Sequence, residues 1–162
     1  MTEKFSLRGT PLLSAGNTQT LLAKAPSLWA HVKVYASGGE NGVHAHPDED
    51  HLFVVLAGEA TFVGPDQSET VVGSYEGMMV PRGAAYAFRS SAEDNLVMIR
   101  VGAPADTTLI DADGKPDVTG SGIPKAVANR VAADGKPAPG LAPTNKTGAV
   151  PGVPIPGRVF AG

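Results

Sequence analysis

Residues 42–59 read GVHAHPDEDHLFVVLAGE and hold three of the four histidines of this 162-residue chain. His44 and His46 are two positions apart, a spacing that places both side chains on the same face of a β-strand. The apolar run 52–57 follows His51 and ends at a glycine, as is typical of a buried strand that leads into a tight turn. The stretch therefore predicts short strands that carry a histidine cluster.

The pattern of short strands extends on both sides of this stretch, over residues 27–101. Apolar residues recur there with a period of two or in short blocks, and glycine, proline or polar residues separate the blocks. No part of the region has the apolar stripe and caps of a helix. Such a series predicts an all-β sandwich, jelly roll or barrel, which we expect to extend from about residue 18 to residue 101. The residues expected in its core are Phe53, Val55, Phe62, Met79 and Phe88.

One of these strands is expected over residues 27–36. Alternation places Leu28, Ala30, Val32 and Val34 on one of its faces. His31 has the opposite phase, so we expect it to be exposed or to lie on a face between two sheets, and not to be a ligand.

The C-terminal part of the chain, residues 102–162, is rich in glycine and proline and contains no histidine. Two interpretations remain open: an extended arm that lies ordered over a neighbouring surface, or a largely mobile tail. Residues 126–131 could form one or two helical turns. In either case we expect a barrel with its lead-in over 1–101, followed by an extension over 102–162 that is not an independent domain.

Composition excludes several classes of function. The chain has no cysteine, which excludes disulfides, thiolate catalysis and zinc–thiolate sites. Its formal net charge is −3 and it has no long basic run, so we expect no nucleic-acid partner. The apolar run 52–57 is too short to cross a bilayer and the N-terminus has no secretory h-region. We therefore expect a cytoplasmic protein that does not contact membranes.

Two imidazoles directed into a barrel interior are costly to desolvate unless a partner satisfies them. A metal ion is one such partner, because neutral imidazole is its commonest nitrogen ligand. Internal hydrogen bonds and water are the other. The pair His44 and His46 alone does not choose between these two possibilities.

Residues 42–59 strongly resemble the first sequence motif of the cupin superfamily, in which HxH is followed by an acidic ligand and then, six residues later, by glycine. Residues 77–88, GMMVPRGAAYAF, resemble the second motif, PxGxxH. The two matches occur in the family's order. The resemblance implies a double-stranded β-helix with a metal site inside it.

The resemblance also implies which residues would hold the metal, with two departures from the family's pattern. His51 stands where the family usually has its glutamate, and Tyr86 stands where it usually has its last histidine. We therefore expect one divalent transition metal (iron, manganese, nickel or zinc) on His44, His46 and His51. Asp50, or its neighbour Glu49, is the alternative third ligand if the connection after His46 bulges. Tyr86 is either a ligand or acid beside the metal, or an aromatic core residue.

Two arginines, Arg82 and Arg100, are further polar candidates. Arg82 lies in the Pro-x-Gly turn that the family places near the barrel rim, where it could attract an anion; a solvated surface arginine is the alternative.

The family's chemistry gives two hypotheses. The first is a metal-dependent enzyme of the dioxygenase, isomerase or lyase type that acts on a small, anionic organic molecule. The second is a non-catalytic binding or sensor protein with a degraded metal site. In both cases we expect a homodimer, since cupins often dimerise and a jelly roll leaves edge strands that need cover.

Overall fold

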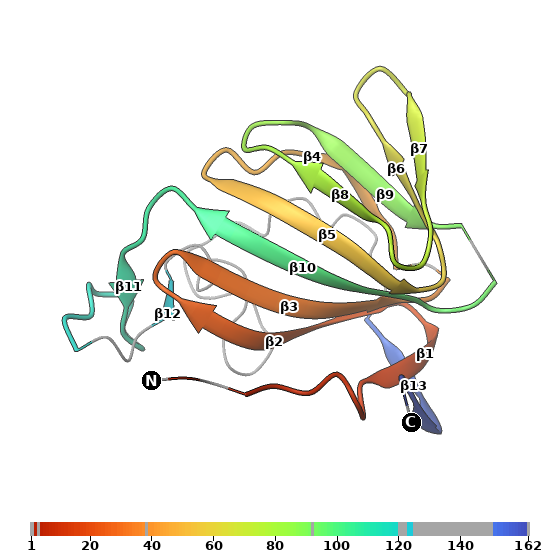
Figure 1. The fold of residues 1–162 in the computed structure, drawn as a ribbon, viewed down its shortest axis with the longest axis horizontal. Coiled ribbons are helices and arrows are strands. Elements are labelled where there is room, and N and C mark those ends of the chain that lie inside the picture. The colour runs from red at the N-terminus through yellow and green to blue at the C-terminus, as the bar shows by residue number, and fades with distance from the viewer. Residues whose placement is uncertain are drawn as a thin grey trace.

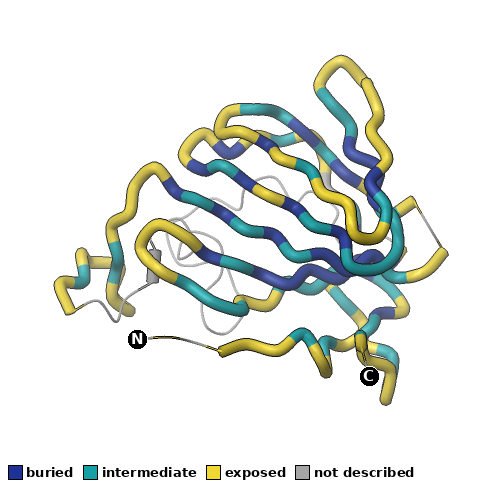
Figure 2. The backbone as a smooth tube through the Cα atoms, viewed as in Figure 1, coloured by how far each residue is buried: buried dark blue, intermediate teal, exposed yellow. Residues whose placement is uncertain are grey.

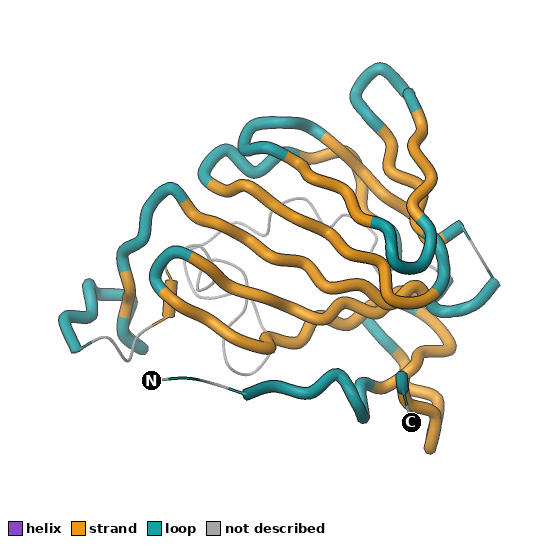
Figure 3. The backbone as a smooth tube through the Cα atoms, viewed as in Figure 1, coloured by secondary structure: helices purple, strands orange, loops and turns teal. Residues whose placement is uncertain are grey.

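The computed structural model describes residues 2, 4–37, 39–91, 93–119, 123–124 and 151–161, which form strands joined by loops and turns (Figure 3). No helix that could span a membrane occurs in this part of the chain. In chain order the strands are β1 (Pro11–Ala15), β2 (Asn17–Ala25), β3 (Leu28–Tyr35), β4 (Asn41–His44), β5 (Glu49–Ala57), β6 (Ala60–Val63), β7 (Glu69–Val72), β8 (Gly77–Val80), β9 (Tyr86–Ser90), β10 (Leu96–Pro104), β11 (Leu109–Ile110), β12 (Ile123–Pro124) and β13 (Val153–Val159).

Two antiparallel sheets make up the barrel. One has five strands in the order β2-β3-β10-β5-β8, and the other has four in the order β4-β9-β6-β7. In Figure 1 the five-stranded sheet crosses the centre of the molecule, and β4, β9, β6 and β7 lie above it. The predicted all-β jelly-roll architecture is confirmed.

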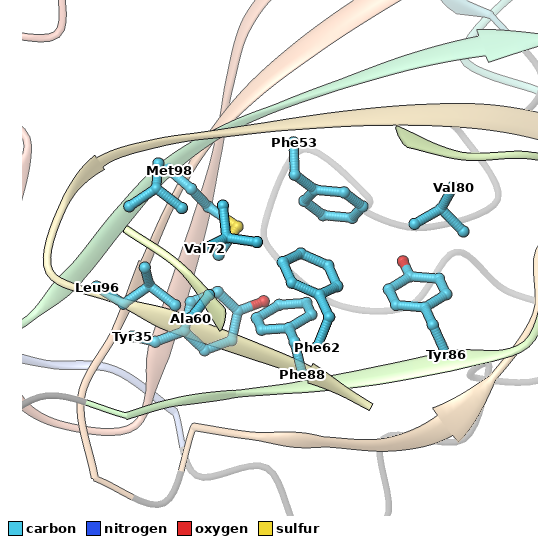
Figure 4. Close-up of a cluster of buried hydrophobic side chains, with 11 residues drawn as sticks. Tyr35, Phe53, Ala60, Phe62, Val72, Val80, Tyr86, Phe88, Leu96 and Met98 are labelled. Atoms are coloured by element: carbon cyan, nitrogen blue, oxygen red, sulfur yellow. The ribbon is translucent and has the colours of Figure 1, made fainter. Parts of the chain in front are cut away.

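The core lies between the two sheets and is rich in aromatic side chains. Phe53, Val55, Phe62 and Phe88 are buried there, as alternation along their strands predicts. Figure 4 shows Phe53, Phe62 and Phe88 in this cluster. Figure 2 shows buried stretches along the strands of the barrel, whereas the connecting loops are mainly exposed. The prediction for Met79 is wrong, since its side chain is 56% exposed. Val80 takes the inward phase on β8, which turns Met79 outward.

Both faces of β3 are buried, and the polar one faces the barrel. Val32 and Val34 share a face, as predicted, but this face lies outside the barrel and packs against Leu13 of β1. The inward face carries four large side chains, all buried: Trp29, His31, Lys33 and Tyr35. Of the two places expected for His31, the face between two sheets is the one observed, because the side chain is 2% exposed.

The end of the chain returns to its beginning. β13 pairs antiparallel with β1, beside the barrel in Figure 1. The Phe160 amide donates to the Thr10 carbonyl oxygen at 2.8 Å, and Phe160 packs against the Leu13 cluster. This part of the extension therefore pairs with the N-terminal segment. The helical turns expected over 126–131 lie outside the described residues.

Candidate functional site

Five buried polar side chains meet inside the barrel at one end of the five-stranded sheet. Strand alternation directs Glu49 and His51 inward from β5, and Arg100 inward from the neighbouring strand β10. His31 lies across from Arg100 on β3. His46 comes from the loop after β4 and completes the group. The site is therefore assembled mainly by the register of three adjacent strands.

Arg100 lies at the centre of this group. Its Nη2 is 3.2 Å from His46 Nε2, and 3.1 and 2.9 Å from His51 Nδ1 and Nε2. Its guanidinium also lies over two aromatic rings, with the carbon Cζ 5.1 Å from the centre of Trp29 and 5.7 Å from that of Phe53. The rings' negative faces help to stabilise a cation that is only 4% exposed.

Glu49 fixes the protonation of His51. Its Oε2 lies 2.8 Å from His51 Nε2, and both side chains are buried. A carboxylate accepts hydrogen bonds, so the hydrogen of a neutral His51 is assigned to Nε2 and Nδ1 is left as the acceptor. Nδ1, the remaining acceptor, lies 3.1 Å from Arg100 Nη2, which is also 2.9 Å from Nε2. The result is a continuous chain of polar contacts, Glu49–His51–Arg100–His46.

Trp29 closes the site on its β3 side. Its ring lies 4.6 Å from that of His31 and 5.6 Å from that of His51. The register of β10 places Gly102 between Trp29 and His51. A Cβ on Gly102 would overlap the indole of Trp29, so the lack of a side chain at this position is what allows Trp29 to cover Arg100.

His44 and Tyr86 lie together on the opposite sheet. They are register partners on β4 and β9, with ring centres 4.7 Å apart. His44 Nδ1 lies 2.8 Å from the Gly42 carbonyl oxygen, which assigns its hydrogen to Nδ1. Tyr86 also belongs to the aromatic core beside Phe62 and Phe88 (Figure 4). It therefore borders both the histidines and the core, a position compatible with either interpretation of Tyr86.

The three histidines differ in depth. His51 is 1% and His46 8% exposed, while His44 is half-buried. Adjacent rings are close, with centres 4.9 Å apart for His44 and His46 and 4.4 Å apart for His46 and His51. The structure thus brings the three predicted ligands into one row that leads inward from β4.

In this arrangement the donor set does not fit a divalent metal. Among the described residues, no three side chains of histidine, cysteine, aspartate or glutamate form a group that could hold one. The Arg100 guanidinium lies where nitrogens of His46 and His51 converge. A metal on these residues requires Arg100 to move away.

Asp50 and Arg82 form a separate pair outside the barrel. Asp50 Oδ1 accepts from the Arg82 backbone amide at 2.8 Å and from Arg82 Nε at 3.3 Å. The side-chain bond from Arg82, together with the bond from its amide, lowers the pKa of Asp50, and the side-chain bond in turn raises the pKa of Arg82. Asp50 therefore points away from His51, as the strand phase predicts.

Sequence analysis named Glu49 and Arg100 as candidates but did not place them beside His51, and it did not single out Trp29 or Lys33. Lys33 is buried with its Nζ 5.1 Å from the centre of the Tyr35 ring and 5.4 Å from that of Phe88. A signal was present in the polar alternation of Trp29, His31 and Lys33 along one strand. The other face of that strand is more apolar, which favours the opposite orientation.

Comparison with known proteins identifies relatives of this fold. A family model described as a cupin domain matches residues 31–102. The protein named Uncharacterized protein YdbB, from Bacillus subtilis, is 34% identical over 59 residues, which are 36% of this chain and 52% of that protein. The match thus spans about half the length of this relative.

Solved structures resemble the barrel at low sequence identity. A double-stranded β-helix protein from Klebsiella pneumoniae has a TM-score of 0.56 at 16% identity, covering 66% of this chain and 94% of that one. An RmlC-like cupin from Desulfovibrio desulfuricans has a TM-score of 0.54 at 19% identity, covering 64% and 97%. KdgF from Halomonas sp. has a TM-score of 0.51 at 17% identity, covering 55% and 81%. At these identities the likeness concerns the fold alone.

Proposed function

We propose that the domain over residues 31–102, which matches the cupin-domain family model, binds a small organic anion inside its barrel. Among the described residues, the buried side chains of ordinarily charged type are two basic ones, Lys33 and Arg100, and one acidic one, Glu49. The interior is thus biased toward positive charge although the whole chain has a formal net charge of −3. Such a bias favours an anionic ligand over a neutral or cationic one.

The observation that carries the proposal is a buried donor on Arg100. Its Nε has no hydrogen-bond partner among the described residues. A buried donor without an acceptor costs about 1–3 kcal/mol, and more when it is charged. A carboxylate can accept from a guanidinium through two parallel bonds, so a bound carboxylate would satisfy this donor. The decreasing exposure from His44 to His51 suggests entry from the β4 side.

A series of small carboxylates tests this proposal. Malonate, succinate and pyruvate are titrated with EDTA present, and thermal unfolding is followed, because a ligand that binds only the folded state raises the unfolding midpoint. We expect at least one carboxylate to raise the midpoint more than its neutral amide does. Arg100→Met should abolish this shift, whereas Arg89→Ala, which removes an exposed arginine paired with Glu69, should keep it. Equal effects of acids and amides would contradict the proposal.

A second candidate function is an enzyme that acts on the bound anion, of the isomerase or lyase type among the activities predicted above. The contact between the Tyr86 and His44 rings favours it, because a phenol beside an imidazole can move a proton to or from a bound molecule. In D2O, exchange of the methyl hydrogens of pyruvate can be followed by NMR. We expect Tyr86→Phe to slow this exchange and to leave pyruvate binding intact. If the wild-type protein exchanges these methyl hydrogens no faster than buffer does, the protein binds pyruvate but does not catalyse the exchange.

The metal-dependent enzyme that the sequence predicts, with iron, manganese, nickel or zinc on His44, His46 and His51, stays a prediction. Metal binding by these histidines depends on whether the Arg100 side chain moves away from His46 and His51.

A further inference from the structure

We infer that Arg100 takes the place of a divalent metal ion between His46 and His51, and that it prevents such an ion from binding there. The positive charge in the site would then come from the Arg100 guanidinium instead of a metal ion. This inference does not require that the proposed anion binds, because it concerns only which cation the histidines hold.

Arg100 and a metal would compete for the same lone pairs. A neutral imidazole has one acceptor nitrogen. On His46, Nε2 lies 3.2 Å from Arg100 Nη2. A metal bonds to histidine nitrogen at about 2.0–2.1 Å, so an ion on this lone pair would lie within contact distance of Nη2. Two positive charges this close inside a protein interior repel each other strongly.

His51 offers no second nitrogen to a metal. Glu49 accepts the Nε2 hydrogen at 2.8 Å, and Arg100 Nη2 lies 2.9 Å from Nε2 and 3.1 Å from Nδ1. The guanidinium therefore lies against both ring nitrogens, and the carboxylate holds one of them. An ion could bind His51 on this side only by displacing Arg100.

Displacing Arg100 would be costly, since more than the histidines hold it. Trp29 and Phe53 flank its guanidinium, and through His51 it is linked to the buried carboxylate of Glu49. Withdrawal would break these contacts together. The arginine therefore remains between the histidines, and metal binding requires its removal by mutation.

The experiment compares Co²⁺ binding by the wild-type protein, Arg100→Met and Lys33→Met, each purified without a histidine tag. Methionine keeps much of the length of either side chain and removes the charge. Lys33 is the matched control because it is also basic, buried and directed inward, but its Nζ lies over Tyr35 and Phe88. Visible absorption of bound Co²⁺ and calorimetry report the binding without any assay of activity.

We expect Arg100→Met to bind Co²⁺ at least about tenfold more tightly than the wild-type protein, the size of effect that groups next to metal ligands commonly have. Lys33→Met should bind like the wild type. Adding His46→Ala to Arg100→Met should remove the gain. The unfolding midpoint of the wild-type protein should not change with EDTA.

Tight Co²⁺ binding by the wild-type protein that is lost in His46→Ala would overturn the inference. So would equal gains in Arg100→Met and Lys33→Met. If Arg100→Met does not fold, as circular dichroism would show, the wild-type titration still decides the question. Failure of the carboxylate titrations alone would count against the proposed function and leave this inference standing.

Discussion

At the scale of single residues, the site depends on the empty space at Gly102. A methyl group on this residue would collide with the Trp29 indole. We expect Gly102→Ala to lower the free energy of unfolding by about 1–3 kcal/mol, as overpacking of a core does. It should also weaken carboxylate binding, because Trp29 must move away from Arg100. Urea denaturation and the titrations above measure the two effects.

Gly42→Ala is the matched control for this substitution. A Cβ on Gly42 meets nothing within 4 Å, although the residue is also in a strand of the barrel. Its unfolding free energy should stay within about 0.5 kcal/mol of the wild-type value. Equal losses in the two variants would show that the Trp29 contact is not the cause.

The sequence contained part of the site at this scale. The inward direction of His51 follows from its alternation with Phe53, which is an ordinary property of a strand. The position of Arg100 does not follow in this way, because its partner His46 is 54 residues away in the chain. The register of β10 against β5 and β3 places Arg100, and the loop after β4 carries His46 to it. No local pattern encodes that arrangement.

At the scale of elements, one face of β5 lies in the core and the other face lies at the surface. Phe53 is fully buried on its inner face, whereas Leu52, the adjacent residue, is 42% exposed on the outer face. We expect Phe53→Ala to cost about 3–5 kcal/mol in unfolding free energy, because it leaves a cavity among four aromatic rings. Leu52→Ala should cost less than about 1 kcal/mol. Chemical denaturation compares them, and similar losses would contradict this assignment of faces.

The bond between Asp50 and Arg82 joins β5 to the turn after β8. Because Arg82 lowers the pKa of Asp50 below its ordinary value of 3.8, the pair stabilises the fold above about pH 4. That contribution is lost as the pH falls through the lowered pKa of the folded state. Arg82→Ala should therefore be less stable than the wild type near neutral pH, and the difference should disappear in strong acid.

Unfolding measured across this pH range tests the pair. In an Asp50→Asn background, Arg82→Ala should have no effect that depends on pH. A pH-dependent effect that persists in that background would assign the stabilisation to another partner of Arg82.

The strands themselves were predictable from the sequence, but which face of β3 points into the barrel was not. Its residues alternate between an apolar set and a polar set, which fits either orientation. The choice depends on β1, which covers the apolar face with Leu13, and on the charged site, which needs the polar face. Neither is part of the local pattern of β3.

At the scale of the whole molecule, the outer face of the five-stranded sheet exposes apolar side chains. Leu52 and Met79 are register partners on β5 and β8, and both are exposed. We expect two copies of the chain to associate through this face as a homodimer. Light scattering should give twice the chain mass of 16.5 kDa, and Met79→Glu should shift the protein to the monomer. A wild-type monomer at micromolar concentration would contradict the prediction.

The pairing of β1 with β13 has a consequence for the nascent chain. Ser14 and its partner Val153 are 139 residues apart, and at about 5–20 residues per second a ribosome needs on the order of ten seconds to add that many. During this interval the barrel strands up to β10 have already emerged, while β1 still lacks its partner β13. An unpaired edge of this kind invites pairing with another chain. When several ribosomes translate one messenger RNA, β1 is therefore the strand by which their unfinished chains would be most prone to pair wrongly with one another.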